Sequence, residues 1–318
     1  MQFTTPIPIK KSNRQIDYNS KIVSLGSCFA VNIGEKFERY KFQNSINPFG
    51  ILFHPVALEK IISKAILKDE FSEEDIFFHN ERWHSFDVHS DLSASDKELF
   101  LKTLNANLKR LHNDLAESSH IIITLGTSWV YRNVETDSVV ANCHKVPQNQ
   151  FKKELLSVED IKIGLEKIID KISSVNKKAK IVFTISPVRH IKDGFVENQW
   201  SKANLISALH HTLTTEHRIL NTAYFPSYEI MMDELRDYRF YAEDMIHPNQ
   251  TAIDYIWERF TSTYVSEEAQ HTMKLADGIQ KGLQHRSFNP ESDSHKKFLH
   301  NLGTKIASLS QKHPHIKF

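Results

Sequence analysis

Four short apolar runs, set among stretches with helical spacing, constrain the fold more than any other feature of this sequence. The runs are IVSL at 22–25, IIITL at 121–125, IVFTI at 181–185 and the weaker NTAYF at 221–225. Each has the length and composition of a strand that is buried in a parallel sheet. Helical spacing is found over 28–37, 96–115, 158–172 and 205–220. Alternating strands and helices predict an α/β fold with a central parallel sheet and right-handed crossovers.

The chain is long enough for one large domain with a sizeable core, since 40% of its 318 residues are hydrophobic. We expect this domain to span residues 1–265. The stretch 40–95 has no clear period and predicts an insertion of loops and short helices near the site. TAIDYIWERF at 251–260 predicts an amphipathic helix, and residues 266–318 predict a helical C-terminal extension.

Charge and composition exclude several classes of protein. The formal net charge is +1, which provides no field to attract nucleic acid or a membrane surface. Neither GxGxxG nor GxxxxGK[ST] occurs, so no phosphate-binding loop is expected. The first residues, MQFTTPIPIKK, lack the apolar segment of a secretory signal, and no stretch reaches the roughly 18 apolar residues of a membrane span. With only 2 cysteines, the cytoplasm is the expected compartment.

Candidate functional residues follow the predicted strands, because ligands of open α/β sheets bind beyond the carboxyl ends of the strands. Gly26-Ser27-Cys28 follows the first run and leads into a helix, whose N-terminus favours an anionic nucleophile or an oxyanion. Gly126-Thr127-Ser128 follows the second run. Arg189 and His190 follow the third, where they are expected to clamp an anionic group or a substrate carbonyl.

Asp244 and His247 lie three residues apart, just before a predicted helix. A carboxylate at this spacing orients an imidazole as a general base, which supplies half of a catalytic triad. The plainer interpretation is a helix cap followed by a solvated histidine. The nucleophile turn far earlier in the chain favours the triad.

The opening turn and these later motifs resemble the GSCFA family, which is related to the SGNH (GDSL-like) hydrolase and acyltransferase superfamily. The blocks that carry the resemblance are GSCFA at 26–30, LGTSWVY at 125–131, ANCHKVP at 141–147, SPVRH at 186–190, YFPSYEIMMDELRDYRFY at 224–241 and DMIHPN at 244–249. The resemblance implies a three-layer sandwich of SGNH or flavodoxin-like type. It also implies an ester-bond hydrolase or acyltransferase.

Register with the superfamily's Gly-Asp-Ser motif implies that Cys28 is the nucleophile. Aligned on Gly26, the aspartate position falls on Ser27 and the nucleophile position on Cys28. A related branch of polysaccharide-decorating acetyltransferases has Gly-Asn-Cys at this place. Ser27 is the second choice, and the alternative is that Cys28 is only a small buried hydrophobe.

The same resemblance implies an oxyanion hole. Gly50 resembles its second-block glycine, and Gly126 belongs to a third block in which Ser128 replaces the usual asparagine. Because a hydroxyl reaches less far than an amide, either Ser128 substitutes, or Asn142 or His144 supplies the donor, or the site has lost ordinary ester hydrolysis. The stretch with His79, Trp83, His84 and His89 is expected to be surface or to line a carbohydrate cleft.

These residues lead to one main hypothesis and three alternatives. The main hypothesis is a hydrolase or acyltransferase that acts on an O-acyl ester of a small molecule or carbohydrate, without a cofactor; a coenzyme A thioester is the expected donor for a transferase. A non-catalytic glycan- or anion-binding module is the first alternative. The others are a redox pair of Cys28 and Cys143, and a metal held by these cysteines with His144 and His247, whose spacing is not that of a zinc site. No metal is therefore expected.

Overall fold

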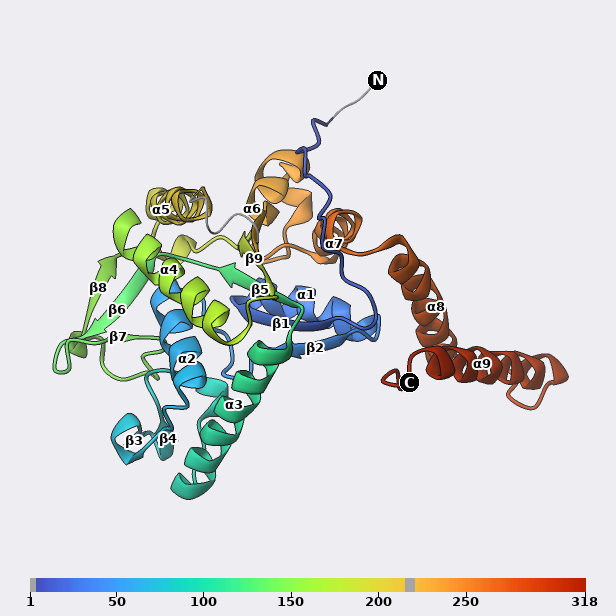
Figure 1. Cartoon of the computed structure of the whole chain (residues 1–318), viewed down its shortest axis with the longest axis horizontal. Coiled ribbons are helices and arrows are strands. Elements are labelled where there is room, and N and C mark those ends of the chain that lie inside the picture. Colours follow the sequence, from blue (N-terminus) through green and yellow to red (C-terminus); the bar gives the residue numbers. More distant parts are fainter. Residues whose placement is uncertain (1–3, 215–220) are drawn as a thin grey trace.

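Five parallel strands form the central sheet, in the order β10-β9-β5-β1-β2 (Figure 1). The computed structural model describes residues 4–214 and 221–318. The strands are β1 (Lys21–Gly26), β2 (Gln43–Ile46), β5 (His120–Leu125), β9 (Lys180–Ile185) and β10 (Thr222–Phe225). The four apolar runs are therefore confirmed as strands. The fifth, β2, has the sequence QNSI and was missed, because an edge strand with one buried residue shows no apolar run.

Helices cover both faces of the sheet, which confirms the predicted three-layer sandwich (Figure 1). They are α1 (Cys28–Arg39), α2 (Pro55–Leu67), α3 (Lys97–Glu117), α4 (Val158–Val175), α5 (Phe195–Leu213), α6 (Ser227–Glu229), α7 (Gln250–Tyr264), α8 (Glu267–Gln284) and α9 (Asp293–Lys312). Short 3₁₀ turns lie at Glu73–Asp75, Ser90–Leu92, Gln148–Gln150, Ile191–Asp193 and Tyr238–Phe240, and a π-helical turn at Ile230–Leu235. The helix predicted over 205–220 begins ten residues earlier, and its last six residues lie outside the described residues.

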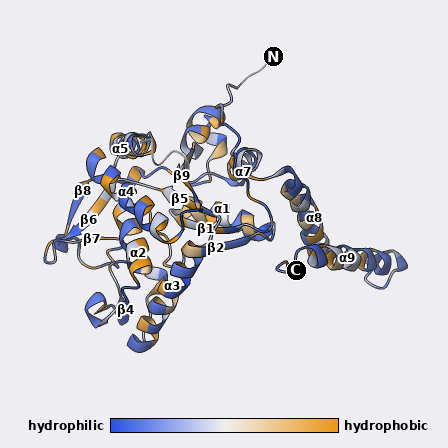
Figure 2. Cartoon of the chain, in the orientation of Figure 1, coloured by the Kyte–Doolittle hydropathy of each residue, from blue (hydrophilic) through white to orange (hydrophobic). Residues whose placement is uncertain are grey.

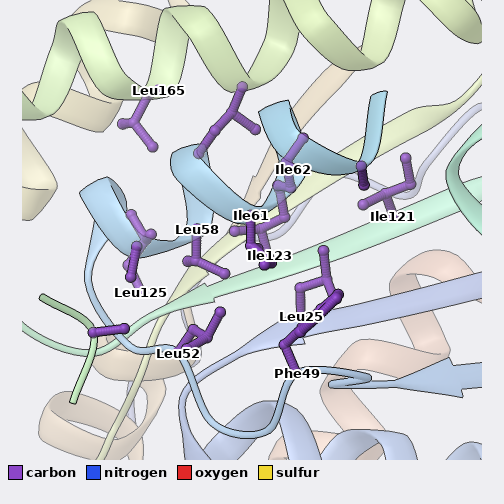
Figure 3. Close-up of a cluster of buried hydrophobic side chains, with 14 of the residues drawn as sticks. Leu25, Phe49, Leu52, Leu58, Ile61, Ile62, Ile121, Ile123, Leu125 and Leu165 are labelled. Carbon is purple, nitrogen blue, oxygen red and sulfur yellow. The ribbon is translucent and has the colours of Figure 1, made fainter. Parts of the chain in front are cut away.

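The alternation of side chains along the strands divides the core into two layers. On β5, Ile121, Ile123 and Leu125 face α2, α3, α4 and α5, whereas Ile122 faces α1 and α7. Figure 3 shows the first layer, in which Leu58, Ile61 and Ile62 of α2 lie over the strands. The apolar residues of the central strands gather in the middle of the molecule, and the outer strand β2 is hydrophilic (Figure 2).

Two regions are more ordered than the sequence predicted. Residues 40–95 hold β2 and the 13-residue helix α2, whose buried Leu58, Ile61, Ile62 and Ala65 have helical spacing, in addition to short helical turns of the kind that the sequence predicted. The same stretch contains the hairpin β3 (Phe77–His79) and β4 (Arg82–His84). A second, antiparallel sheet consists of β6 (Trp129–Asn133), β7 (Val139–Val140) and β8 (Phe151–Leu155).

Helices α8 and α9 extend away from the sheet, and the last residues of the chain return to it (Figure 1). The ring of His313 lies 4.9 Å from that of Tyr18, and the ammonium of Lys41 lies 5.4 Å from the ring of Phe318. Ile316 is buried in the layer that contains α1 and α7. Residues after 266 are helical as predicted, and within the described residues no helix has the length and apolar character to cross a membrane.

Candidate active site

The turn after β1 accepts only glycine at position 26. Gly26 has a φ of +129°, and a Cβ there would lie 2.1 Å from the carbonyl oxygen of Thr124 on β5. The backbone N–H of Ser27 donates to that same oxygen at 3.0 Å. Because this close approach ends β1 and lets α1 begin at Cys28, residue 28 lies at the carboxyl edge of the sheet.

This turn stands where the strand order reverses. The chain passes from β1 to β2 on one side, and β5, β9 and β10 follow on the other. In open α/β sheets, the crevice beyond the strand ends at such a switch point is the usual ligand site. The topology therefore places Ser27 and Cys28 at the position where a site is expected.

Asn47 fixes the backbone of the turn from the adjacent strand. Its side-chain oxygen accepts the N–H of Gly26 at 2.8 Å, and its side-chain nitrogen donates to the carbonyl of Gly26 at 3.2 Å. Asn47 itself has a φ of 37°, in the left-handed region that asparagine tolerates. Sequence analysis missed this contact, although the run INPFG at 46–50 signals a turn.

Ser27 and Cys28 differ in access. Ser27 is the N-cap residue of α1, but its side chain makes no capping hydrogen bond, and its buried hydroxyl has no partner among the described residues. Cys28 is half-buried. Only the thiol is therefore exposed enough to meet a substrate in this conformation.

The environment of the thiol keeps it protonated in the resting protein. Burial raises the pKa of the Cys28 thiol above its ordinary value, although the N–H of Phe29, the ammonium of Lys202 and the N–H of Cys28 act in the opposite direction. The first N–H groups of α1 lower this pKa as expected, but desolvation outweighs them in this conformation. Nucleophilic attack therefore requires a base.

Asp244 and His247 form the predicted pair. Nδ1 of His247 and Oδ2 of Asp244 are 2.6 Å apart. Oδ1 of Asp244 accepts the backbone N–H groups of Ile246 and His247 at 2.9 and 3.0 Å. Hydrogen bonds from the backbone and side chain of His247 and from the backbone of Ile246 lower the pKa of Asp244 to about 2. Of the plainer interpretation, the cap is not seen, because Asn249 and not Asp244 caps α7, whereas the side chain of His247 is 48% exposed, as that interpretation expects.

Arg189 holds the loop that carries this pair. Its backbone N–H donates to the carbonyl of Ile246 at 3.2 Å, and its guanidinium donates to the carbonyl of Met245 at 3.0 Å. Rings of Phe195, Tyr238 and Tyr241 surround the guanidinium at 5.4 to 5.7 Å. The side chain predicted to clamp an anion thus contacts the chain's own loop, and it ties that loop to the end of β9.

His190 lies deeper at the same edge. Its Nε2 is buried without a hydrogen-bond partner among the described residues, and a Cβ on Gly126 would lie 3.2 Å from that nitrogen. Burial, with help from the charges of Lys202 and His247, lowers the pKa of His190 to about 3. His190 is therefore neutral. The charges of Lys202 on α5 and of His247 in the loop before α7 both act on it.

The predicted oxyanion donors already have acceptors. The N–H of Gly50 donates to the carbonyl of Asn47 at 2.8 Å, and that of Gly126 donates to the carbonyl of Phe53 at 2.6 Å. The hydroxyl of Ser128 is fully buried and donates to the carbonyl of Ser201 at 3.1 Å. In this conformation, none of the three has a proton left for a ligand.

Asn142 and His144 lie at a different pocket, of about 690 Å³, which the hairpin residues Arg82 and His84 also line. Their own contacts are internal: the oxygen of Asn142 accepts the N–H of His144 at 2.8 Å, and the ring of His144 lies 2.7 Å from the carbonyl of Ser85. The lining of this pocket includes none of positions 27, 28, 244 and 247. The structure therefore does not bring these two residues to the nucleophile turn.

Lys202 is the residue that sequence analysis missed. It lies on the face of α5 that packs on the sheet, and its ammonium donates to the carbonyls of Gly126 and Ser186 at 2.7 and 2.8 Å. The signal was its helical spacing from Leu205, since a lysine in an apolar stripe requires an explanation. The helix predicted from 205 onwards left Lys202 out.

The described residues show neither a disulfide nor a metal-binding cluster that would support the redox and metal alternatives. Cys28 and Cys143 are both free thiols. Burial raises the pKa of Cys143 to about 11. Among the described residues, no three His, Cys, Asp or Glu side chains gather as a metal site would require.

Together, the sheet order and the two motifs at its carboxyl edge define a three-layer α/β protein with a helix-starting cysteine and a preformed Asp–His pair. The model of the GSCFA family matches residues 21–260, and that of the GSCFA domain protein, C-terminal domain, matches residues 276–318. The chain belongs to the GSCFA family. No curated protein matches it.

Proposed function

We propose that this protein transfers or hydrolyses an acyl group of an oxygen ester, with Cys28 as nucleophile and His247 as base. The observation that carries the proposal is the 2.6 Å contact between Asp244 and His247, in a loop tied to the sheet edge at which α1 presents Cys28. A resemblance to the SGNH superfamily supports the same roles, because Cys28 and the Asp-x-x-His motif fall at that superfamily's catalytic positions.

In the proposed reaction, Nε2 of His247 takes the proton of the thiol while the sulfur attacks the ester carbonyl. Asp244 holds Nδ1 and stabilises the imidazolium that results. When the tetrahedral intermediate collapses, the C–O bond breaks and the alcohol leaves with the proton from His247. Water or an acceptor alcohol then gives its proton to His247 and attacks the thioester, which releases Cys28.

Negative charge on the intermediate needs hydrogen-bond donors. The first N–H groups of a helix have no acceptor within it, and among the described residues those of Cys28 and Phe29 have no backbone acceptor elsewhere. We assign the oxyanion to these two groups and to the dipole of α1. This assignment replaces Gly50, Gly126 and Ser128, whose protons are used internally.

Among substrate classes, a carbohydrate ester is favoured by the exposed aromatic side chains beside Arg189. The exposed aromatic side chains Phe195, on α5, and Tyr238, on the 3₁₀ turn Tyr238–Phe240, lie beside the guanidinium of Arg189. Aromatic faces of this kind can pack against sugar rings. For a transferase, the acyl donor is expected to be a coenzyme A thioester; the C–S bond of the donor then breaks, and the coenzyme A thiol leaves with the proton from His247.

The test is turnover of a panel of acyl esters, including acetylated oligosaccharides, by the parent and by Cys28→Ala and His247→Ala. We expect either change to lower kcat by roughly 10²-fold or more, because each removes a group used in the bond-breaking step. Cys143→Ala is the matched control and should keep full activity. Full activity in Cys28→Ala or His247→Ala would contradict the assignment.

A second function, that of a glycan- or anion-binding module, is favoured by one observation: the expected oxyanion donors all have internal acceptors. Calorimetry with an acetylated oligosaccharide separates the two. The module predicts binding without turnover, and affinity that Cys28→Ala leaves unchanged. The enzyme predicts turnover that depends on Cys28.

A further inference from the structure

Lys202 is a buried cation directly beneath the strand ends of the candidate site. Its side chain is 1% exposed. The ammonium donates to the carbonyl of Gly126, which follows β5, and to that of Ser186, which follows β9. Because an ammonium has three protons, one remains after these two hydrogen bonds. The ring of Tyr228 covers another side, with its centroid 5.5 Å from Nζ.

No carboxylate forms an ion pair with Lys202 among the residues that the structure describes. Glu229, on α6, acts on it only at a distance, and the carboxylate of Glu229 accepts the hydroxyl of Tyr224 at 2.6 and 2.7 Å. His190, from the loop after β9, is neutral and lies on another side. Burial of an ammonium without an anion is costly, and burial lowers the pKa of Lys202 to about 7.

Cys28 lies at the same edge of the sheet as Lys202: it begins α1 after β1, and β1 pairs with β5, at whose end Gly126 accepts the ammonium. The two groups act on each other: the ammonium lowers the pKa of the thiol, and a thiolate raises that of the lysine. The thiol has the N–H groups of Phe29 and Cys28 on its other side. A thiolate at position 28 would thus have an ammonium nearby and backbone donors beside it.

We propose that Lys202 is the internal counter-ion of Cys28, so that a thiolate at position 28 is stabilised by the buried ammonium. This inference rests on the proposed role of Cys28. The thiol proton passes to His247, the electron pair stays on sulfur, and Lys202 keeps its own proton. When the sulfur forms a neutral thioester, the ammonium again lacks an anion, which favours release of the acyl group. Lys202 is a positioning residue, because it acts through Cys28 and not on the substrate.

The test follows alkylation of Cys28 by iodoacetamide as a function of pH. A Cys143→Ser background leaves Cys28 as the one remaining thiol, since the chain has 2 cysteines. In that background, Lys202→Met is compared with Lys180→Met. Lys180 is a suitable control because it is also buried and also donates to a backbone carbonyl, that of Thr222, but at the opposite end of β9.

Lys202→Met should move the pH profile of alkylation to higher pH and slow alkylation at pH 6 by about tenfold, the effect of one pKa unit, because Lys202 is charged below its pKa of about 7. Lys180→Met should stay within about twofold of the parent. Superimposable profiles for Lys202→Met and the parent would overturn the proposal. Ester turnover does not enter this readout. If Lys202→Met shifts the alkylation profile but the parent turns over no ester, only the proposed function is refuted. If turnover depends on Cys28 but Lys202→Met does not shift the profile, only the counter-ion proposal is refuted.

A reciprocal measurement keeps the proposal testable if Lys202→Met does not fold. The lysine titration is followed by NMR with carbon-labelled lysine, and Lys202→Arg identifies the signal. Because coupling between two sites is mutual, Cys28→Asp, which places a carboxylate at that position, should move the titration of Lys202 to higher pH. A Lys202 titration that is the same in the parent and in Cys28→Asp would overturn the proposal.

Discussion

Gly26 and Asn47 determine the shape of the nucleophile turn at the level of single residues. Gly26 supplies the positive φ and the missing Cβ that let β1 pass within contact of Thr124, and Asn47 pairs with both backbone groups of Gly26. Neither residue takes part in the proposed reaction. Both act by fixing where α1 begins, and so where the thiol lies.

Gly26→Ala should destabilise the protein by roughly 3 kcal/mol, because the new Cβ meets the Thr124 oxygen at 2.1 Å in a strained conformation. Gly303→Ala is the control: this glycine of α9 has no neighbour within 4 Å of a Cβ, so alanine should stabilise by about 0.5–1 kcal/mol. Urea unfolding measures both. Equal effects would contradict the account of the turn.

The sequence predicted the site residues only where chemistry coincided with a local pattern. Cys28 follows an apolar run and a glycine turn, and Asp244 and His247 are close in the chain. These three residues could therefore be proposed as site residues from the sequence alone. Lys202 could not, because its importance depends on which carbonyls α5 meets after folding. The donors at Gly50 and Gly126 were misjudged for a similar reason, since the sequence does not show which N–H groups find internal acceptors.

At the scale of elements, α1 begins without a side-chain cap, whereas α4 has a full capping box. Ser157 accepts the N–H of Asp160, and the carboxylate of Asp160 accepts the N–H of Ser157. Ser27 occupies the equivalent position on α1 with its hydroxyl unpaired. The open start of α1 leaves its N–H groups available to the thiol and to an oxyanion.

Ser157→Ala should therefore cost about 1 kcal/mol of stability, the usual value of a cap, while Ser27→Ala should cost less than about 0.5 kcal/mol. Thermal unfolding of the two variants checks this. A cost for Ser27→Ala as large as that for Ser157→Ala would mean that Ser27 caps α1 in solution, and the free donors assigned to the oxyanion would be lost.

The elements that could be predicted are those whose burial leaves a simple period. Buried on both faces, β1, β5 and β9 read as apolar runs, and α4 begins at Val158, where the helical spacing predicts. The antiparallel strands β6 and β8 mix buried residues with partly or fully exposed ones over five positions each. Their pairing depends on contacts between distant segments, which a local pattern does not record.

At the scale of the whole molecule, histidines whose pKa is lowered by burial couple stability to pH. Burial lowers the pKa of His54, His120 and His144 to about 4 and that of His190 to about 3. In the unfolded chain a histidine titrates near 6.5. Between about pH 6.5 and 4 the unfolded state therefore binds more protons, so this stability is present above pH 6.5 and lost as the pH falls.

We expect the free energy of unfolding to fall from pH 7 to pH 5, with a contribution of up to about 1.4 kcal/mol per pH unit from each such histidine. His54→Asn should reduce this slope by up to about 1.4 kcal/mol per pH unit, because it removes one histidine that takes up a proton on unfolding. Asparagine can still cap α2 in place of the imidazole, so the helix start is kept. Chemical denaturation at several pH values measures the slope. An unchanged slope in His54→Asn would show that His54 is not neutral in the fold.

The most direct test of the central claim is to trap the acyl group on the protein. The parent is mixed with an ester that it turns over, quenched in acid during the first turnovers and digested for peptide mass spectrometry. We predict an acyl adduct on Cys28 that neutral hydroxylamine removes, as expected of a thioester, and no adduct in Cys28→Ala; any acyl adduct formed in Cys28→Ser is an oxygen ester and should resist neutral hydroxylamine. An adduct on Ser27, or turnover that continues in Cys28→Ala, would contradict the assignment of the nucleophile.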